Sequence, residues 1–342
     1  MKLPLKLKEE KMYYSISKCY SYDCYLNLIT GGRGIGKTTG ALIHAIKNYN
    51  NRGSQFIYLR RYKPELKAFI KKDPISNIID GVRYEGDGAG GYSIKVDDET
   101  IGHCIPLSCS VTYKSISLPK VDLIIFDEYT LLHNNVNRYL TNEVHTLLDF
   151  ASTVFRTRPN NKILLLGNNL DLFNPYYTYF DIPNFEEVYV DRSRGIFVHH
   201  PKTNPKLLEV EQETPLYKLT KGTAYAEYHY ENKLLSNVER IICGKPNNAR
   251  IYCRMRVNTY TLNVYLYDIL GETRMFVEYR DKVINDNITY TFMDNNKYNR
   301  YDIKLFSDRF KNYMYKMYFG NKVSYSNEKA ADTFGSLISS LK

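Results

Sequence analysis

Residues 31–38 constrain the fold more than any other stretch of the chain. They match the pattern G-x-x-x-x-G-K-[ST], and they are Gly31, Gly32, Arg33, Gly34, Ile35, Gly36, Lys37 and Thr38. An apolar run at 25–30 precedes them, and a segment compatible with a helix follows at 38–48. This order of strand, loop and helix is the context in which the pattern forms a phosphate-binding loop. The alternative, a glycine-rich turn before an ordinary helix, leaves the adjacent lysine and threonine unexplained.

The residue types in this loop indicate how it holds a triphosphate. Glycines allow the backbone N–H groups to turn inward without Cβ clashes, and the following helix adds donors and the positive end of its dipole. We expect Lys37 to reach the β- and γ-phosphates and the Thr38 hydroxyl to bind Mg²⁺. Thr39 is assigned to the nucleotide site with them. Because the glycine spacing is not G-x-G-x-x-G, ATP with Mg²⁺ is favoured over a dinucleotide.

Two carboxylates follow a second apolar run. Residues 121–126 are mostly apolar, and Asp127 and Glu128 come directly after them. A strand buried on both faces is apolar along its length, so the pair marks where the strand emerges at the ligand edge of the sheet. We expect Asp127 to hold Mg²⁺, directly or through water, and Glu128 to orient and deprotonate the attacking water. Either carboxylate alone also suits a helix cap or an ion pair, but the pair downstream of a phosphate loop favours catalysis.

Three cations follow a third apolar run. The apolar run 55–59 is followed by Arg60 and Arg61, and then by Lys63 with a proline beside it. The proline predicts that a helix begins here. Ligands bind at strand ends in a parallel sheet, so these cations are candidates for a functional role. A solvated basic corner of the protein explains them equally well.

A helix predicted over 143–154 ends in two arginines, Arg156 and Arg158, before a proline. An arginine at this position can pair with a carboxylate, complement the helix dipole or reach the phosphates of a neighbouring subunit. From the residues alone, the ion pair is favoured. A further apolar run, 162–166, is followed by Asn168. An amide there suits sensing of the γ-phosphate or the attacking water, and it also suits a simple turn.

The pattern divides the chain into three regions. Residues 1–200 are expected to form an α/β ATPase domain with a mainly parallel sheet and a β-hairpin inserted at 81–107, which either contacts a partner or covers a sheet edge. Regular apolar periods fade from 191 to about 222, and 201–235 are assigned to a linker. Residues 236–342 predict a small α+β domain. Its expected elements are three alternating strands in an antiparallel meander and one helix, at 249–257, 261–267, 273–279 and 307–318.

The composition narrows the class of partner. The 342 residues include 47 Lys and Arg against 37 Asp and Glu, a formal charge of +10. Such a chain suits a polyanion, with nucleic acid favoured over an anionic membrane. Codon bias in an AT-rich genome is another explanation for the abundant lysine. The sequence has no apolar stretch long enough to cross a membrane and no secretory signal, so we expect no membrane partner and a cytosolic location.

The cysteine and histidine residues give no sign of a metal site. None of the six cysteines has C-x-x-C spacing, and we expect free, mostly buried thiols. His103 with Cys104, and His199 with His200, lack a second set of ligands nearby in the sequence. Free thiols agree with the cytosolic location.

Five segments of the chain resemble the DNA-packaging ATPase family of small tailed phages of the phi twenty-nine type. They are 31–38, 56–66, 126–128, 142–144 and 153–156. The resemblance implies a RecA-like P-loop ATPase of the ASCE class, which drives double-stranded DNA through a portal into a preformed capsid. It also implies a ring of five subunits in the host-cell cytoplasm, transiently docked on the procapsid, with each ATP site completed by a neighbour. A scaffold RNA as an additional partner stays open.

The resemblance further implies roles for individual residues. Arg156 falls at the position of an arginine finger that acts in trans, with Arg158 as the second choice, and this reverses the ion-pair preference. Lys63 falls where the family presents a cation to the DNA channel, and Arg61 is assigned to the same contact. Arg60 is placed near the nucleotide, and Asn168 aligns with an amide at a strand end.

The family's C-terminal domain is RNase H-like in shape without a working nuclease, so the resemblance implies a vestigial nuclease fold here. The expected strand at 249–257 contains no carboxylate, and Asp268, Glu278 and Asp281 are scattered in the sequence. Two-metal cleavage needs clustered oxygen ligands. A triad assembled by folding stays open at this stage.

The function favoured by the sequence is an ATP-hydrolysing translocase for double-stranded DNA. One alternative is a terminase-like ATPase whose C-terminal domain is an active, metal-dependent nuclease. Another is a nucleotide-gated binding protein without turnover. Glu128 argues against the latter, because a pure switch has little need of a general base.

Overall fold

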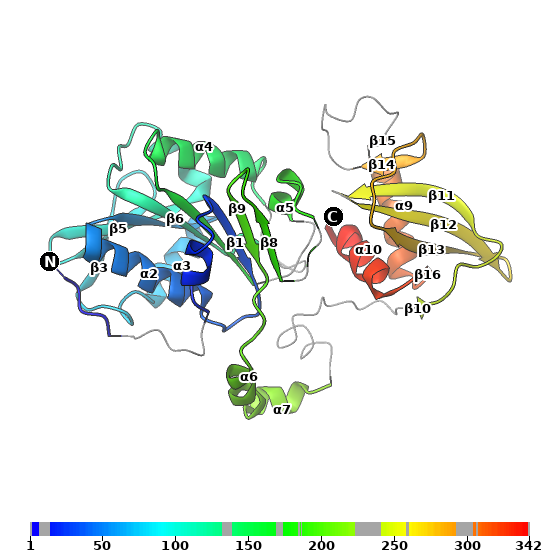
Figure 1. Ribbon diagram of the computed structural model, residues 1–342, viewed down its shortest axis with the longest axis horizontal. Coiled ribbons are helices and arrows are strands. Elements are labelled where there is room, and N and C mark those ends of the chain that lie inside the picture. The colour runs from blue at the N-terminus through cyan, green and yellow to red at the C-terminus, as the bar shows by residue number, and fades with distance from the viewer. Residues whose placement is uncertain are drawn as a thin grey trace. The chain divides into compact units, whose positions relative to one another are not determined.

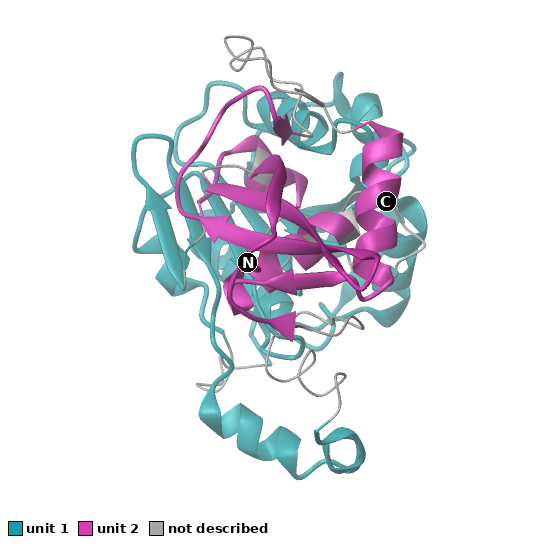
Figure 2. Ribbon diagram, turned by 90° about the vertical axis from the view of Figure 1, so that its right-hand side faces the viewer, with its two compact units in different colours: residues 1–170, 185–233 teal, residues 171–184, 234–342 magenta. Residues whose placement is uncertain are grey.

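The computed structural model describes residues 2–6, 14–131, 139–168, 174–183, 185, 187–222, 241–257, 260–291, 304–305 and 307–340. The chain divides into two compact units, coloured teal and magenta in Figure 2, which are residues 1–170 with 185–233 and residues 171–184 with 234–342. The sequence-based boundaries differ from this division. They assign 201–235 to a linker, whereas 201–233 belong to the first unit in the structure.

The first unit is built on a sheet whose nine described strands follow the order β3-β4-β5-β2-β6-β7-β1-β9-β8. These strands are β1 (Leu26–Thr30), β2 (Gln55–Arg60), β3 (Val82–Gly86), β4 (Tyr92–Val96), β5 (Glu99–Pro106), β6 (Val121–Asp127), β7 (Lys162–Gly167), β8 (Val188–Asp191) and β9 (Ile196–His199). Neighbours from β5 to β9 in this order pair in parallel, and β3, β4 and β8 add antiparallel edges. The mainly parallel sheet expected from the sequence is therefore present.

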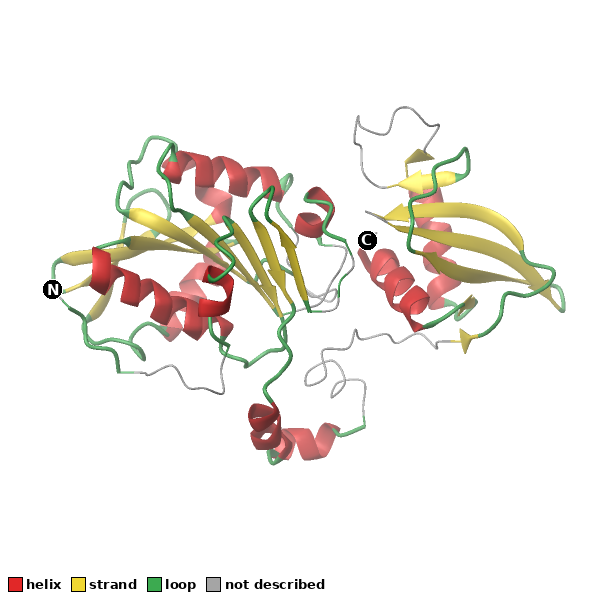
Figure 3. Cartoon of the chain, viewed as in Figure 1, coloured by secondary structure: helices red, strands yellow, loops and turns green. Residues whose placement is uncertain are grey.

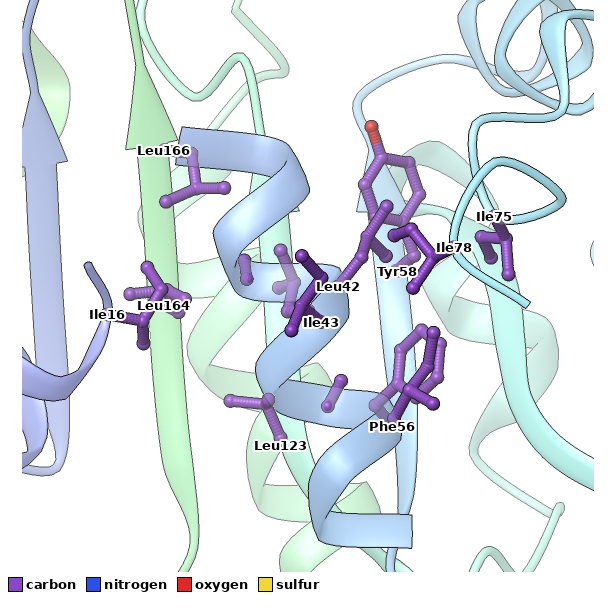
Figure 4. Close-up of a cluster of buried hydrophobic side chains, with 14 of the residues drawn as sticks. Ile16, Leu42, Ile43, Phe56, Tyr58, Ile75, Ile78, Leu123, Leu164 and Leu166 are labelled. Atoms are coloured by element: carbon purple, nitrogen blue, oxygen red, sulfur yellow. The ribbon is translucent and has the colours of Figure 1, made fainter. Parts of the chain in front are cut away.

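Helices cover both faces of this sheet (Figure 3). α2 (Lys37–Arg52) and α3 (Lys63–Lys72) pack on one face, and α4 (Glu143–Phe155) lies on the other (Figure 1). Figure 4 shows Leu42 of α2 in the resulting core, with Leu123 and Leu164 from the sheet nearby. Each fully buried side chain of this kind contributes about 1.5–3 kcal/mol, so the core fixes α2 and the loop before it against the sheet.

The strand order brings three functional segments to one edge of the sheet. β7 lies between β1, which leads into the loop 31–38, and β6, which ends in Asp127. All three strands run in the same direction, so their C-terminal ends meet. One strand between the loop-bearing and the carboxylate-bearing strand is the arrangement that defines the additional-strand (ASCE) class expected from the sequence. Ligands bind at this edge in open α/β sheets.

The edges of the sheet differ from the sequence-based prediction. The expected hairpin at 81–107 is a three-stranded meander, because β3 pairs with β4 and β5 joins the centre of the sheet beside β2. The expected loss of regular structure from 191 onward is wrong for β9, which is buried and pairs with β1. A strand of four residues is too short to show a reliable apolar period.

The described part of the first unit also contains three further helices and a 3₁₀ segment, namely α1 (Ser17–Tyr20), η1 (Leu107–Tyr113), α6 (Pro205–Gln212) and α7 (Pro215–Thr220). α6 and α7 begin alike, with a side-chain cap followed by proline. Asn204 Oδ1 accepts from the Lys206 N–H, and Thr214 Oγ1 accepts from the Tyr217 N–H. These caps satisfy backbone donors that a helix leaves unpaired at its start.

The second unit has a sheet with the described order β10-β16-β13-β12-β11-β14-β15. Its elements are α5 (Pro175–Tyr179), β10 (Ile241–Ile242), β11 (Arg250–Val257), β12 (Tyr260–Ile269), β13 (Glu272–Arg280), β14 (Thr289–Thr291), β15 (Lys304–Leu305), α9 (Asp308–Phe319), β16 (Val323–Tyr325) and α10 (Glu328–Ser340). β11, β12 and β13 form the antiparallel meander that their alternating pattern predicts. α9 and α10 pack against this sheet through Met314, Phe334 and Leu337.

None of the described helices is long and apolar enough to span a membrane. All six cysteines are free, and Cys109 and Cys243 are the two that are partly exposed. His199 is buried, and its ring nitrogens lie 2.9 Å from the Tyr14 hydroxyl and 3.1 Å from Lys18 Nζ. In the part of the chain that the structure describes, no group of three His, Cys, Asp or Glu side chains is placed to hold a metal ion.

Candidate nucleotide-binding site

The loop 31–38 adopts a conformation that depends on its glycines. Gly34 and Gly36 have φ values of +84° and +83°, which are strained for residues with a Cβ. Gly31 has a different requirement, because a Cβ there would lie 2.9 Å from Pro201 Cγ. The loop is also tied to the N-terminal segment, since the Tyr14 N–H donates to the Ile35 carbonyl at 2.8 Å. This hydrogen bond fixes the loop to the N-terminal segment.

Lys37 is buried within this loop. Its ammonium donates to the carbonyls of Gly31 at 3.0 Å and Gly32 at 2.6 Å. Burial lowers the pKa of the Lys37 ammonium to about 8, and the nearby Asp127 carboxylate opposes this shift. A desolvated cation that is held by neutral carbonyls gains strongly from an anionic ligand, which is the electrostatic requirement of a phosphate site.

Thr38 and Asp127 are brought together as the sequence predicts. The Thr38 hydroxyl donates to Asp127 Oδ2 at 2.9 Å, and the Tyr58 hydroxyl donates to the same oxygen at 2.7 Å. Tyr58 is fully buried, and burial together with Asp127 raises its pKa well above the ordinary value. A hydroxyl and a carboxylate at this separation offer the hard oxygen donors that Mg²⁺ prefers. Tyr58 orients the carboxylate, a contact that sequence reasoning missed.

Glu128 is paired with Arg60 rather than pointing freely into the site. Arg60 Nη2 donates to Glu128 Oε2 at 2.6 Å, and Arg60 Nη1 lies 3.7 Å from Asp127 Oδ2. Glu128 has φ of +58°, the left-handed region, which costs an L-residue roughly 1–2 kcal/mol. Its N–H donates to Asp127 Oδ1 at 3.1 Å. The expected position of Arg60 near the nucleotide site agrees with this geometry, and a contact with the nucleotide itself stays a prediction.

Arg61 does not lie at the surface, which corrects its assignment to DNA. Only 1% of the residue is exposed, and its guanidinium forms a bidentate ion pair with Glu143, the first residue of α4. Adjacent cations at a strand end look alike in sequence, but Arg60 and Arg61 point to different partners here. Lys63 is exposed at the start of α3, so it remains available for a phosphate contact.

The two arginines after α4 also differ. Arg156 is exposed and occupies the C-cap of the helix, with φ of +50° and ψ of −126°. Arg158 is half-buried, and its guanidinium donates to the carbonyls of Leu118, Pro119, Val154 and Phe155. Arg158 therefore closes the end of α4 onto the segment before β6. This geometry argues against Arg158 as the fallback finger, because its donors are already used within its own chain.

The remaining predicted residues lie around the same edge. Arg33 and Thr39 are exposed, and Asn168 is half-buried directly after β7. The next residue, Asn169, also carries an amide and lies outside the described residues. The segment after Asp127 packs closely against the end of β7. A glycine at position 167 allows this, because a Cβ there would lie 2.6 Å from Thr130 Oγ1.

Glu211 is a second residue that sequence reasoning missed. It lies on α6, and its Oε1 would be 3.4 Å from a Cβ on Gly34. Burial raises the pKa of the Glu211 carboxyl. No local motif points to it, since α6 follows the loop by more than 160 residues in sequence and carries an ordinary pattern. The start of the region once assigned to a linker thus lies beside the phosphate loop.

The strand order, the glycine loop, Lys37 and the Thr38–Asp127 contact together define a P-loop NTPase of the additional-strand class. The comparison with known families is more specific. A model of the podovirus DNA encapsidation protein (Gp16) family matches residues 8–318. The DNA packaging protein of Bacillus phage B103 is 33% identical over 259 residues, covering 72% of this chain and 78% of the relative. The chain belongs to this podovirus DNA encapsidation family, as its sequence segments predict.

Three further matches agree. The DNA packaging protein of Bacillus phage phi29 is 30% identical over 266 residues, covering 75% of this chain and 76% of the relative. The structure of the phi29 viral genome packaging motor assembly matches with a TM-score of 0.58 at 24% identity, over 97% of this chain and 100% of that chain. The Phi-28 gp11 packaging motor matches with a TM-score of 0.56 at 16% identity, over 97% and 99% of the two chains. At these identities the two structures establish similarity of fold.

Proposed function

We propose that this encapsidation protein hydrolyses ATP to drive double-stranded DNA through a portal into a preformed capsid. The observation that carries the proposal is the contact between Thr38 and Asp127 at 2.9 Å, with Glu128 directly following. It joins the end of the phosphate loop to the carboxylate pair, which is the arrangement that phosphoryl transfer to water requires.

The residues present suit ATP with Mg²⁺. Lys37 exchanges the carbonyls of its own loop for phosphate oxygens, and the loop N–H groups and the start of α2 bind the remaining oxygens. Thr38 and Asp127 are the residues that would hold Mg²⁺, with Tyr58 fixing the carboxylate from behind. The metal supplies charge neutralisation between the phosphates when it is bound. These residues bind and orient the phosphates and the metal, and the proton transfer is the role of Glu128.

Glu128 acts in this proposal as the general base for the attacking water. The Arg60 guanidinium occupies Glu128 Oε2 at 2.6 Å, so Glu128 has to leave Arg60 before this oxygen can accept a proton from the attacking water. The pair therefore represents a resting arrangement of the site. Substitution of Glu128 by glutamine keeps the size and hydrogen bonds of the side chain but removes the base.

Arg156 completes the site of a neighbouring subunit. It is exposed at the C-terminus of α4, it has no ion pair with a described residue, and Arg158 holds the helix end in place behind it. A finger in trans raises turnover by about 10³ to 10⁵. By resemblance to the family, we propose a ring of five such subunits, with a portal and a scaffold RNA as further partners. The mass of the assembled complex, measured in solution, tests the stoichiometry.

Mixing experiments test the shared site. Glu128→Gln subunits lack the base and Arg156→Ala subunits lack the finger, so each population alone is inactive. In a mixed ring, an Arg156→Ala subunit keeps its own Glu128 and receives Arg156 from a Glu128→Gln neighbour, which restores part of the ATPase activity. If mixing restores no activity while both variants still assemble, the finger does not act in trans.

Lys63 is the proposed contact with the DNA backbone. Its exposed ammonium at the start of α3 can bind phosphate without reading bases, so the contact is independent of sequence and weakened by salt. We expect Lys63→Ala to reduce DNA-stimulated ATPase activity and the slope of log affinity against log salt by about one. Lys71→Ala, another exposed lysine at the far end of the same helix, is the matched control. If Lys63→Ala and Lys71→Ala have equal effects, the proposal that Lys63 contacts the DNA backbone specifically is wrong.

We propose that the second unit retains a nuclease-like fold without nuclease activity. Five consecutive strands of its sheet, β13-β12-β11-β14-β15, are antiparallel among the first three and parallel afterwards, which supports an RNase H-like sheet. β16 and β10 extend the sheet beyond β13. Neither β11 nor β14 carries a carboxylate. The scattered acids have local partners instead: Asp268 accepts from Thr273, Glu278 from Asn263 and Tyr265, and Asp281 from Lys329. Plasmid cutting in Mn²⁺ that Asp268→Ala abolishes would overturn this assignment.

The decisive test of the function is ATP hydrolysis in the presence of DNA. We expect double-stranded DNA to stimulate phosphate release by the wild-type protein and Glu128→Gln to abolish it while ATP still binds. A nucleotide-gated switch without turnover predicts the opposite, namely that Glu128→Gln packages DNA normally and Lys37→Ala does not. Packaging by Glu128→Gln protein at the wild-type rate would refute the motor.

A further inference from the structure

A buried ion pair contacts the backbone of residues 128–129, the segment that directly follows β6. Arg61 follows β2 and is 1% exposed, and Glu143 begins α4 and is 2% exposed. Arg61 Nε lies 2.6 Å from Glu143 Oε2, and Arg61 Nη2 lies 3.0 Å from Glu143 Oε1. The guanidinium also packs against the rings of Phe126 and Tyr139 at 5.4 and 4.9 Å. Removing both charges from water costs several kcal/mol per ion, so stability alone is a poor reason for this pair.

The other donors of Arg61 reach the backbone that carries Glu128. Arg61 Nη1 donates to the Glu128 carbonyl at 3.1 Å, and Nη2 donates to the Tyr129 carbonyl at 2.7 Å. These are the first two carbonyls after Asp127, at the point where Glu128 has φ of +58°. A left-handed residue other than glycine persists only where its surroundings determine the conformation. One planar guanidinium does so here by bonding both carbonyls and Glu143 at the same time.

Glu143 connects this loop to the helix that ends in Arg156. Its Oε2 also accepts from the Leu140 N–H at 2.9 Å, so it fixes the segment entering α4 as well as Arg61. α4 has 13 residues, which corresponds to a length of about 20 Å. The loop of Glu128 and the start of the helix that presents Arg156 are therefore joined by a single buried pair.

We propose that Arg61 and Glu143 are positioning residues for hydrolysis: they hold the backbone of Glu128 in the conformation that aims its carboxylate, and they link that loop to the helix bearing Arg156. The inference rests on the proposed function, because it assumes that Glu128 is the base. Neither residue belongs to the phosphate loop or to the Thr38–Asp127 contact. Their loss lowers kcat and leaves ATP binding intact, since Lys37 and Thr38 lie on a different loop.

The test separates positioning from stability. The double variant Arg61→Met/Glu143→Leu replaces the pair by apolar side chains of similar length, and such replacements of buried ion pairs are often neutral or stabilising. We expect it to remain folded, with an unfolding temperature lowered only by the two carbonyls that lose Arg61 as a donor, to bind a fluorescent ATP analogue within twofold of the wild type, and to lose about 10- to 100-fold in kcat. A displacement of about 1 Å at a reacting group suffices for such a loss.

A second variant covers the case in which the double variant does not fold. Glu143→Gln keeps one oxygen for Arg61 and removes the charge, so we expect an intermediate loss of kcat with an unchanged KM for ATP. Arg61→Lys keeps the charge but cannot bond both carbonyls, and it should not restore kcat. If a folded Arg61→Met/Glu143→Leu or Glu143→Gln protein retains wild-type kcat, the pair is merely structural and the inference is overturned. If the wild-type protein has no ATPase activity that depends on Glu128, the proposed function fails and the inference fails with it.

Discussion

Replacing Arg60 by alanine distinguishes the two roles that its position allows. Arg60 contacts Glu128 at 2.6 Å and lies 3.7 Å from Asp127, at the edge where the nucleotide is expected. In one role it restrains the catalytic carboxylate in a resting state. In the other it binds the nucleotide directly. The structure provides an ion pair for the first role, and we predict that restraint is the dominant effect.

The expected magnitude follows from the exposure of the two side chains. Arg60 is 13% exposed and Glu128 is 47% exposed, so solvent screens the pair and its contribution is about 0.5–1 kcal/mol. Since 1.4 kcal/mol is a factor of ten, removing the pair raises the fraction of released Glu128 by about two- to fivefold. We therefore predict that Arg60→Ala raises basal kcat by about two- to fivefold and reduces the further stimulation by DNA.

The assay is phosphate release at saturating ATP, with and without double-stranded DNA, at one fixed protein concentration. Arg60→Lys is the matched control, because it retains a cation that can pair with Glu128 and should keep basal kcat near the wild-type value. A higher KM for ATP with unchanged kcat in Arg60→Ala assigns the residue to nucleotide binding. That result, or a fall in basal kcat, refutes the restraint.

Three other predictions concern proton uptake, close packing and the end of α4. In the protein without nucleotide, burial lowers the pKa of the Lys37 ammonium to about 8, and a bound triphosphate would raise this pKa again. Above pH 8, ATP binding is therefore coupled to the uptake of a proton by Lys37. ATP affinity should thus fall by up to about tenfold per pH unit from pH 8 upward in fluorescence titrations, and a flat profile to pH 9.5 contradicts the assignment. Gly167→Ala places a Cβ 2.6 Å from Thr130 Oγ1 and should destabilise the protein by about 1–3 kcal/mol in chemical denaturation, whereas an unchanged midpoint shows that the loop yields. Arg158→Ala removes the bonds to four carbonyls and should lower the free energy of unfolding by about 1–3 kcal/mol without reducing kcat of the folded protein; a loss of kcat comparable to that of Arg156→Ala restores Arg158 as a finger candidate.

Contiguous motifs made the central part of the site predictable. The loop, its helix and the strand before it adjoin in sequence, so their residue types report one local structure. Asp127 was placed correctly because a buried strand has to be apolar until it reaches the sheet edge. The contact between Thr38 and Asp127 then follows from the parallel sheet.

Partners from distant segments were not predictable. Tyr58 orients Asp127 from the middle of β2, where an aromatic residue resembles ordinary core. Arg61 was assigned to DNA because a cation at a strand end is expected to be exposed to solvent. Its actual partner, the Glu143 carboxylate, is 82 residues away in the sequence. Glu211 reaches the phosphate loop from α6 through a fold-level contact. In each case the deciding interaction depends on packing between elements rather than on local pattern.

The prediction missed the short strand β9 for a related reason. β9 has four residues and lies just before Pro201, so it offers too few positions for a periodic signal. Its assignment depends on pairing with β1, which the alternation of side chains cannot reveal. The strands β11, β12 and β13 of the second unit were easier to predict, because they are long and their residues alternate along most of their length.

The central claim is that each ATP site is shared between subunits of a DNA-translocating ring. Its most direct test is the ATPase rate per protomer as a function of protein concentration, with and without double-stranded DNA. The shared site predicts a weak rate at low concentration, a cooperative rise as subunits assemble, and further stimulation by DNA that Arg156→Ala removes. A rate per protomer that is independent of concentration and unaffected by Arg156→Ala contradicts the claim.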